Sequence, residues 1–379
     1  MSIGLKNFEE CIEKVTYGNK IQRTEYLDKG MFPVVSQESK LINGFWNNEE
    51  DLYIVKQPVI VFGDHTRILK FIDFSFVLGA DGTKIIKPKS FIDSKFFYYF
   101  LEANPIQSKG YSRHYRFLKE LKINVPPLAT QQKTVAKLDA LFSEIDIAKA
   151  SAGANAKNAE TLFQSYLTGI YEHDREGWNK KKISEIAKIK GGKRVPKGYE
   201  LKNEVTPYVY LRVTNFSESG DIDTTDLRYV GSEVWTGIKN YIINSEDLYV
   251  SIAGTIGRTG MVSEQLSGSL LTENACRLVF NNDISNRFVY YFTKSSSFIS
   301  QTVEQTRTTA QPKLALSRLG EITLAIPSLE EQLEINKKLD FITTQISIYK
   351  NSYEQKIIEL NALKQAILQK AFSGELVKD

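Results

Sequence analysis

The sequence predicts an α+β fold made of two related halves, in which a strand-rich region precedes a long helix in each half. Three observations support this prediction. Residues 126–171 recur at 327–372 without a gap, at an offset of 201 residues (327 − 126). Each copy carries apolar residues at steps of three and four, which is the spacing of one face of an α-helix. The regions before the copies contain short runs of β-branched and aromatic residues bounded by glycine, asparagine and aspartate.

The repeat is supported by identical residues throughout its length. Such internal similarity decides the architecture, so it is sought before any local feature. The matched residues are Leu128 with Leu329, Gln131 with Gln332, Lys137–Asp139 with Lys338–Asp340, Ile145 with Ile346, Ile147 with Ile348, Lys149 with Lys350, Leu162 with Leu363, Gln164 with Gln365 and Leu167 with Leu368.

We expect the two helices to run antiparallel and to form an intramolecular coiled coil. Both apolar stripes are narrow and equally long, as a paired seam requires. Close packing also needs small residues opposite large ones. The sequence offers such sets in mid-helix, namely Ala148, Ala152 and Ala156 in the first helix and Tyr349, Tyr353 and Ile357 in the second. The alternative is that each helix packs only on its own domain.

These patterns divide the chain into four parts. A first strand-rich domain covers residues 1–125 and the first long helix covers 126–171. A second strand-rich domain covers 172–326, and the second long helix with the C-terminal tail covers 327–379. Both domains are expected to mix strands with short helices, and the whole to be pseudo-symmetric.

Within the domains, turn residues and apolar runs predict individual elements. The first domain should contain strands at Phe32–Ser36 and Asp51–Gly63, a hairpin across Ile72–Pro88, and a helix at Ser94–Asn104 with Ser94 as N-cap. The second should contain strands at Pro207–Val213, Asp247–Val262 and Ala275–Phe280 and a helix at Asn286–Ser295. Tyr98-Tyr99-Phe100 matches Tyr290-Tyr291-Phe292, so the domains themselves are loosely related.

Composition favours a globular cytoplasmic protein. The net charge of +4 is small beside 49 basic and 45 acidic side chains, so charge alone weakly supports nucleic-acid binding. The two cysteines, Cys11 and Cys276, are too few and too far apart for a disulfide framework or a zinc motif. The N-terminus lacks the apolar segment of a signal peptide, and no apolar run reaches membrane-spanning length.

No catalytic motif is found. The glycine-rich segment Gly254–Gly260 lacks the lysine of a P-loop, so it is interpreted as a turn between strands. Asn124–Leu128 lacks the aromatic residue of an amino-methyltransferase motif and is interpreted as a helix entry. Asp81–Lys84 fits a hairpin turn better than a nuclease fragment. The three histidines are scattered, which argues against a metal site.

A basic, glycine-containing segment opens the second domain. Nine lysines and arginines and only two glutamates fall in Lys180–Lys202, a net charge of +7. Lysine neutralises phosphate, and glycines such as Gly191, Gly192 and Gly198 allow close backbone approach. A single charge run is more often a solvated surface.

Basic residues also occur at equivalent places before the two long helices. Arg113–Arg116 combines basic and aromatic residues in the first domain. Arg307, Gln311 and Lys313 occupy the corresponding place in the second. Their recurrence in both halves favours DNA as the partner.

With the repeat and these basic segments described, the chain resembles the specificity subunit of Type I restriction–modification enzymes, over nearly its whole length. The residues that carry the resemblance are Pro126–Asp139 with its repeat Pro327–Asp340, the tail Leu363–Leu376, and two segments similar to recurrent types of target recognition domain, Phe32–Asn47 with Phe62–Lys84 and Ser251–Val262. The sequence departs from the family at Ala129–Gln132, where an acidic residue commonly precedes Gln131.

The resemblance implies a non-catalytic reader of double-stranded DNA. Each target recognition domain would read one half of a split, asymmetric site. The helices would set the spacing and hold two methyltransferase subunits, which restriction or translocase subunits would join. A helix of about 40 residues is about 60 Å long, more than one duplex turn of about 34–36 Å. This chain would need no cofactor, metal or membrane; S-adenosylmethionine, ATP and Mg²⁺ would belong to the partners.

We expect base and phosphate contacts from polar and basic side chains on the loops of each domain, since Arg, Gln and Asn can pair bidentately with base edges. The candidates are Gln37, His65, Arg67, Arg113 and Arg116 in the first domain and Lys193, Arg194, Asn215, Arg258 and Lys313 in the second. For the partner subunits the candidates are Leu128, Gln131, Leu329, Gln332 and Phe372.

Three other functions stay open at this point. The chain could be the specificity subunit of a related Type II methyltransferase–nuclease system. It could be an active restriction or modification enzyme, which an S-adenosylmethionine-binding assay would reveal. It could be a coiled-coil scaffold without affinity for nucleic acid, which a salt-titrated DNA-binding curve would separate from a DNA reader.

Overall fold

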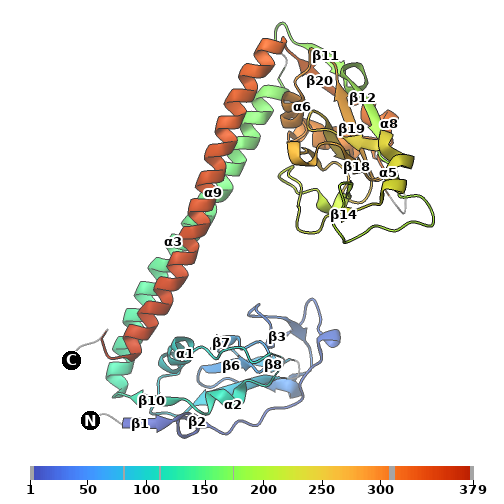
Figure 1. Cartoon of the computed structure of the whole chain (residues 1–379). Coiled ribbons are helices and arrows are strands. Elements are labelled where there is room, and N and C mark those ends of the chain that lie inside the picture. The colour runs from blue at the N-terminus through green and yellow to red at the C-terminus, as the bar shows by residue number, and fades with distance from the viewer. Residues whose placement is uncertain (1–3, 80–81, 111, 174, 307–311, 376–379) are drawn as a thin grey trace. The chain divides into compact units, whose positions relative to one another are not determined.

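The computed structural model describes residues 4–79, 82–110, 112–173, 175–306 and 312–375. The chain divides into two compact units, the first made of Met1–Gly153 with Tyr353–Asp379 and the second of Ala154–Ser352. Each unit contains one strand-rich region and segments of both long helices, α3 (Leu128–Tyr171) and α9 (Leu329–Phe372) (Figure 1).

The described residues of the first unit form two four-stranded sheets and a two-stranded ribbon. The strand orders are β2-β9-β6-β7 and β4-β3-β8-β5, with β1 paired to β10, and only β3 and β8 run parallel among these pairs. Its strands are β1 (Gly4–Asn7), β2 (Ile12–Glu13), β3 (Phe32–Val35), β4 (Gly44–Trp46), β5 (Leu52–Tyr53), β6 (Val59–Gly63), β7 (Leu69–Ile72), β8 (Phe76–Leu78), β9 (Thr83–Pro88) and β10 (Lys122–Val125). Its short helices are α1 (Ser94–Ala103) and α2 (Tyr115–Leu118).

The second unit has the same topology. The orders are β12-β19-β16-β17 and β14-β13-β18-β15, with β11 paired to β20 and a parallel β13–β18 pair. Its strands are β11 (Asn179–Lys182), β12 (Ala187–Gly191), β13 (Val209–Leu211), β14 (Arg228–Tyr229), β15 (Ile242–Ile243), β16 (Leu248–Ser251), β17 (Thr259–Met261), β18 (Ser269–Leu271), β19 (Ala275–Phe280) and β20 (Thr323–Ile326). Its short helices are α4 (Ile183–Ile186), α5 (Ser232–Ile238), α6 (Asn286–Phe292), α7 (Ser296–Gln305) and α8 (Leu316–Gly320). Matched in chain order, each strand described in one unit has a counterpart in the other, so the expected relation between the domains is confirmed.

The hairpin expected across Ile72–Pro88 is not formed. β8 pairs with β3 and β5, whereas β9 pairs with β2 and β6. The chain therefore crosses from one sheet to the other between these strands. Both are apolar and flank turn residues, so their pattern is the same whether the link is a hairpin or a crossover. By contrast, most of the segment Gly254–Gly260 does lie in the link between antiparallel strands β16 and β17, and its last two residues, Thr259 and Gly260, begin β17.

The cap of α1 also differs by one residue from expectation. The side chain of Asp93 accepts hydrogen bonds from the backbone N–H groups of Lys95 and Phe96, both at 2.9 Å. Ser94 instead donates to the carbonyl of Pro58 at 2.7 Å. Aspartate and serine are similarly good caps, and the sequence alone does not separate adjacent candidates.

The two long helices match each other residue for residue. Each spans 44 residues, and both ends are related by the offset of 201. In the first unit, the opening part of α3 packs on the closing part of α9; in the second, the closing part of α3 shares a core with the opening part of α9. The residues concerned are Leu138, Phe142 and Ile145 with Leu360, Ile367 and Leu368, and Leu167 and Ile170 with Ile335 and Leu339. The antiparallel arrangement is confirmed.

The expected match of small and large residues in mid-helix is only partly observed. Ala152 is buried, with 2% of its surface exposed, but Tyr349 is 53% exposed and does not fill a seam. The spacing of the apolar residues indicates which face of each helix is buried, but it does not determine which residues of the two helices lie opposite each other. The apolar face of a straight helix shifts gradually relative to a seven-residue repeat. In the described ranges, none of the helices combines the length and apolar character needed to cross a membrane.

Candidate nucleic-acid interface

Gln131 joins the first turn of α3 to the cap of α1. Its side-chain oxygen accepts the N–H of Asp93 at 2.8 Å, and its Nε2 donates to the carbonyls of Phe91 at 3.0 Å and Pro126 at 2.8 Å. The side chain is fully buried. The prediction that Gln131 lies on a partner-binding surface is therefore wrong, since all its polar groups serve the interior.

Gln332 makes the same three bonds in the second unit. Its oxygen accepts the N–H of Ser285, the cap of α6, at 2.8 Å, and its Nε2 donates to the carbonyls of Asp283 at 3.2 Å and Pro327 at 3.1 Å. It too is fully buried, so its predicted partner-binding role is corrected in the same way. The glutamines fix each strand-rich region to the helix that follows it.

Phe372, a partly buried partner candidate, packs on α1 of the first unit. Its ring lies 5.0 Å from that of Phe96 and 5.6 Å from that of Phe100, between centroids. Its counterpart Tyr171 lies 5.1 Å from Phe288 and 5.6 Å from Phe292. These contacts fix the end of each long helix on the strand-rich region of its own unit. The role of Phe372 is thus in packing, whereas Leu128 and Leu329 are 42% and 40% exposed.

Four segments of the first unit meet around Asp64, in the β6–β7 link. The N–H of Asp64 donates to the carbonyl of Gly82 before β9 at 2.7 Å, and its carbonyl accepts the N–H of His114, before α2, at 2.9 Å. Its carboxylate accepts the N–H of Tyr115 at 2.7 Å. The next residue, His65, donates its N–H to the side chain of Gln37, after β3, at 3.3 Å. We call these four segments the recognition loops.

The corresponding loops of the second unit meet in the same way. The N–H of Ile252 donates to the carbonyl of Asn274 at 2.8 Å, and its carbonyl accepts the N–H of Leu314 at 2.9 Å. The segment after β13 joins them through the bond from Thr272 N–H to the Leu211 carbonyl at 3.1 Å, which corresponds to the bond from Gly79 N–H to the Val35 carbonyl at 2.9 Å in the first unit. The recognition loops are therefore placed by matching backbone hydrogen bonds while their side chains differ.

Arg113 and Arg116 line a basic cleft of about 450 Å³ at these loops. Lys84 and Lys119 share it, and Asp64, the acidic residue among the described residues that line it, is 2% exposed with its carboxylate bonded to backbone. The sequence does not point to these two lysines as site residues. Lys84 has uncharged neighbours, and Lys119 lies in a segment that contains both acidic and basic residues. His114, between the arginines, is fully buried; its Nδ1 lies 2.9 Å from the Asp64 carbonyl.

The other first-unit candidates lie close to the same loops. The side chain of Gln37 contacts the backbone of His65, which brings these two candidates together. Arg67 occupies a left-handed conformation with φ of 64° and donates from Nη1 to the carbonyl of Ile106 at 3.3 Å. Its side chain is directed toward a separate cleft of about 400 Å³ that Ile106 also lines.

In the second unit, Lys193 and Lys313 are exposed. The Lys193 ammonium lies 5.7 Å from the centre of the Tyr241 ring, and Lys313 forms a bridge with Ala253 in the β16–β17 link. Arg258 donates from Nη1 to the carbonyl of Phe216 at 2.9 Å and lies 3.4 Å from Glu218, so it also supports the loop after β13. Arg307 and Gln311 lie outside the described residues.

Asn215 has no free edge for reading a base. Its side chain is 2% exposed, and its oxygen accepts the N–H of Arg212 at 3.0 Å. Its Nδ2 donates to the carbonyls of Asp223 and Asp226, both at 3.2 Å. The prediction of a base contact from Asn215 is corrected: the side chain shapes the loop after β13. An asparagine in a turn can contact a ligand or can bond to the backbone of its own loop, and the burial of the side chain shows which of these roles it has.

Gly192 is also needed for packing rather than for approach to phosphate. A Cβ at this position would lie 2.1 Å from the carbonyl oxygen of Thr272 and 2.4 Å from that of Leu271. Gly198, in contrast, has φ of +94° with open space around its Cβ position. The glycines of the basic segment thus have different physical roles.

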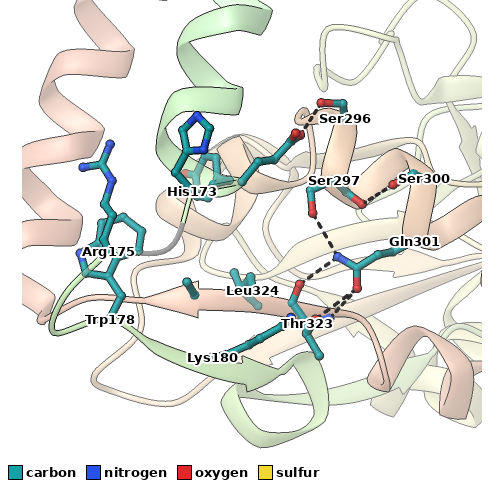
Figure 2. Close-up of a pocket in the computed structure, with 13 residues that line it drawn as sticks. His173, Arg175, Trp178, Lys180, Ser296, Ser297, Ser300, Gln301, Thr323 and Leu324 are labelled. Atoms are coloured by element: carbon teal, nitrogen blue, oxygen red, sulfur yellow. Dashed lines mark hydrogen bonds between the residues drawn. The ribbon is translucent and has the colours of Figure 1, made fainter.

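A larger cavity, of about 710 Å³, lies beside the end of α3 in the second unit (Figure 2). It is lined by residues of α3, α7 and the β11–β20 ribbon. The Arg175 guanidinium lies 5.2 Å from the centre of the Trp178 ring, and Gln301 donates to the Thr323 carbonyl at 2.9 Å. Ser296 donates to Glu172. Much of its polar lining is internally bonded, and it shares no element with the recognition loops of this unit.

Comparison with known proteins decides the family. The sequence matches the Type I restriction modification DNA specificity domain over residues 9–152 and 175–358. The chain belongs to this family. The two matched segments fall one on each half of the repeat, as expected from the sequence.

Individual relatives agree with this assignment. The chain is 25% identical over 296 residues to the Type I restriction enzyme EcoBI specificity subunit of Escherichia coli, which covers 69% of this chain and 60% of that protein. It is 21% identical over 379 residues to the MjaVIII specificity subunit of Methanocaldococcus jannaschii, covering 93% and 85%. Both are Type I proteins, so a Type II system is not favoured.

Solved structures show the same fold. A chain from a structure of a type I R-M system, described for its complex assembly and conformational transition, matches with a TM-score of 0.73 at 16% identity, covering 99% of both chains. The HsdS subunit from Thermoanaerobacter tengcongensis matches with a TM-score of 0.55 at 18% identity, covering 98% of this chain and 97% of that one.

Proposed function

We propose that this chain is the sequence-specific DNA-binding subunit of a Type I restriction–modification complex, and that each unit reads one half of a split, asymmetric site in double-stranded DNA. The observation that carries the proposal is the pair of recognition-loop sets. They are placed by matching backbone hydrogen bonds, yet one presents Arg113 and Arg116 where the other presents Lys313. Two loop sets with the same backbone arrangement but different side chains are suited to reading two different DNA half-sites.

The loop side chains supply both kinds of DNA contact. Exposed lysine and arginine neutralise phosphates and position the protein, while bidentate groups distinguish base edges in the major groove. We assign phosphate contacts to Lys84, Lys119, Lys193 and Lys313, and keep Gln37, His65, Arg67, Arg113, Arg116, Arg194 and Arg258 as candidates for base edges. Asn215 is withdrawn because its amide is used internally.

We further propose that the long helices hold two copies of one methyltransferase subunit, to which restriction or translocase subunits attach. Support comes from exposed apolar residues at matching positions of α3 and α9, since apolar contact surface in matching places fits two like partners. The pairs, with their exposed fractions, are Leu128 (42%) and Leu329 (40%), Ile147 (58%) and Ile348 (55%), and Leu162 (69%) and Leu363 (48%). In this assignment the chain is non-catalytic and cytoplasmic, and S-adenosylmethionine, ATP and Mg²⁺ act in the partners.

Exchange of one recognition region tests the proposal. Residues 1–125 would be replaced by the same region of another family member in one chimaera, and residues 172–326 in a second. Methylated sites would then be mapped across the host genome. Each exchange should change one half of the recognised sequence and leave the other half and the gap unchanged. If both halves changed together, or if the chain without exchange directed no site-specific methylation, independent reading by two units would be refuted.

A further inference from the structure

A carboxylate lies within the recognition loops of the second unit. Glu273 immediately precedes Asn274, whose carbonyl receives the N–H of Ile252 from the β16–β17 link. It lines a cleft of about 450 Å³ together with Arg194, Arg212, Tyr199 and Tyr210. The cleft thus combines two arginines, two aromatic rings and one acid at the surface that the proposed function assigns to DNA.

Two side chains hold Glu273 in one orientation. Its Oε2 accepts the hydroxyl of Thr272 at 3.0 Å and lies 3.4 Å from the hydroxyl of Tyr210, which donates to the carbonyl of Lys193 at 2.8 Å. Its Oε1 accepts Nε of Arg194 at 2.5 Å. The side chain of Glu273 is 26% exposed, whereas that of Arg194 is 78% exposed. The acid is therefore held by Thr272 and Arg194 with part of it still facing solvent, and most of the Arg194 side chain is exposed.

Glu273 is ionised at neutral pH. Partial burial by itself raises the pKa of a carboxyl group, but hydrogen bonds from Arg194 and Thr272 favour the charged form. The balance leaves the pKa of Glu273 below its usual value. An ionised carboxylate only accepts hydrogen bonds.

A fixed carboxylate has a specific use at a DNA-binding surface. It is repelled by phosphate, so it weakens binding unless a donor on the DNA faces it. In the major groove the donors are exocyclic amino groups, N4 of cytosine and N6 of adenine, and glutamate most often pairs with cytosine. Guanine and thymine present acceptors at those positions and would be rejected by the negative charge.

We infer that Glu273 determines specificity in the half-site read by the second unit, by accepting a hydrogen bond from the exocyclic amino group of cytosine or adenine. Arg194 is a positioning residue that neutralises Glu273 in the free protein and can turn to a neighbouring phosphate or guanine in the complex. The inference rests on the proposed function, and it adds a residue that the sequence alone does not point to, because a single acid in a mostly uncharged segment does not suggest DNA contact.

The test uses the full chain assembled with its methyltransferase subunits. Glu273→Ala and Glu273→Gln would be compared with the parent on a series of duplexes in which every base pair of the recognised site is changed in turn. Glu264→Gln, an exposed acid on the same unit, is the matched control. Methylation rate and DNA affinity would be measured for each duplex, and thermal unfolding would confirm that the variants are folded.

Glu273→Ala should reduce discrimination at one base pair of the second half-site by about 10- to 100-fold, the range of a single base-reading contact. The first half-site and the Glu264→Gln control should be unaffected. Glu273→Gln should shift the preference at that base pair toward adenine, because the amide pairs bidentately with adenine. The base that the parent protein prefers at this position, cytosine or adenine, is the base that Glu273 contacts.

Two results would overturn the inference while leaving the proposed function intact. One is unchanged discrimination at every position in both variants. The other is an equal loss of affinity for all duplexes, which would assign Glu273 to loop structure. A parent complex that does not discriminate between duplexes at all would instead overturn the proposed function.

Discussion

The hydroxyl of Tyr99 in α1 donates a hydrogen bond to the carboxylate of Asp139 in α3 at 2.5 Å. The same carboxylate binds the ammonium of Lys95 at 2.8 Å. Burial, followed by this hydrogen bond, raises the pKa of Tyr99, so the donor stays protonated. In the second unit Tyr291 and Arg287 repeat both contacts to Asp340. An aspartate of each long helix therefore holds a short helix of the same unit through a tyrosine and a basic residue four positions apart, Lys95 with Tyr99 and Arg287 with Tyr291.

Among these attachment residues, substitution of the buried glutamines Gln131 and Gln332 should lower the stability of the protein most. Gln131→Ala removes the partners of three part-buried backbone groups, so we expect the free energy of unfolding to fall by about 2–4 kcal/mol. Gln332→Ala should behave alike because its three bonds correspond. Urea unfolding of the full chain measures both. Gln132→Ala, a neighbouring exposed residue, should change stability by less than about 0.5 kcal/mol; an equal loss in this control would contradict the assignment.

The two units offer a natural comparison of a buried ion pair with an apolar pair. Arg277 and Asp247 lie 2.9 Å apart with side chains 10% and 6% exposed. Leu248 pairs with Leu278 in the second unit, and Ile60 pairs with Ile86 at the same place in the first. Counting one residue back from each, Val59 is equivalent to Asp247 and Ile85 is equivalent to Arg277. Val59 and Ile85 are both buried.

Transfer of the apolar pair into the second unit should therefore be tolerated. Asp247→Val alone leaves a buried arginine unpaired and should cost about 3–5 kcal/mol, whereas Asp247→Val with Arg277→Ile should be neutral or stabilising by about 1–4 kcal/mol. Chemical denaturation of the single and double variants measures the coupling. A double variant as unstable as the single one would show that the surrounding core requires the charges.

Lys70 should make stability rise with pH. It is 5% exposed and donates to the Lys40 and Leu41 carbonyls and to Asn43 Oδ1, in the loop after β3. Burial lowers the pKa of Lys70 to about 8. Between that value and its ordinary one the unfolded chain binds more protons, so the free energy of unfolding should increase with pH by roughly 2–3 kcal/mol for this group.

The pH effect is isolated by comparing variants. The difference in unfolding free energy between the parent and Lys70→Met should grow in favour of the parent from pH 7 to pH 10. Lys70→Arg keeps its charge throughout and should show no such increase. A difference that is flat or falls over this range would mean that Lys70 is not desolvated in the folded protein.

Exposed residues at the helix starts should affect assembly but not folding. Leu128→Glu places an acid at the N-terminus of α3, where the helix dipole favours it, so the stability of the chain should be maintained. If the proposed methyltransferase subunits contact this position, the variant should lose one bound copy, Leu329→Glu the other, and the double variant both. Native mass spectrometry of the reconstituted complex counts them. Retention of both copies by the double variant would exclude these leucines from the contact.

The long elements could be predicted from the sequence because the repeat and the helical spacing act over 44 residues. The short ones could not all be predicted. β8 is only three residues long, and its partner strands β3 and β5 lie elsewhere in the sequence, so its assignment to a sheet depends on distant pairing. Propensity is a weak guide for such strands.

The candidate site shows the same limit. Arg113 and Arg116 were found because they stand in a basic run, and both line a cleft at the recognition loops. Gln131, Gln332 and Asn215 were assigned to surfaces because amide side chains bind partners, bases and backbone equally well. Their burial, which decides among these uses, depends on segments distant in the sequence, such as Asp93 for Gln131.

The recurrence of Gln131, Asp139 and Tyr171 as Gln332, Asp340 and Phe372 bears on how such a chain can change during evolution. A strand-rich region that shares this spacing can enter by recombination within the DNA for either long helix, and it then meets the attachment residues at the spacing it already has. New sequence preferences can thus arise in a single genetic event, without the many compensating substitutions that a redesigned interface would need.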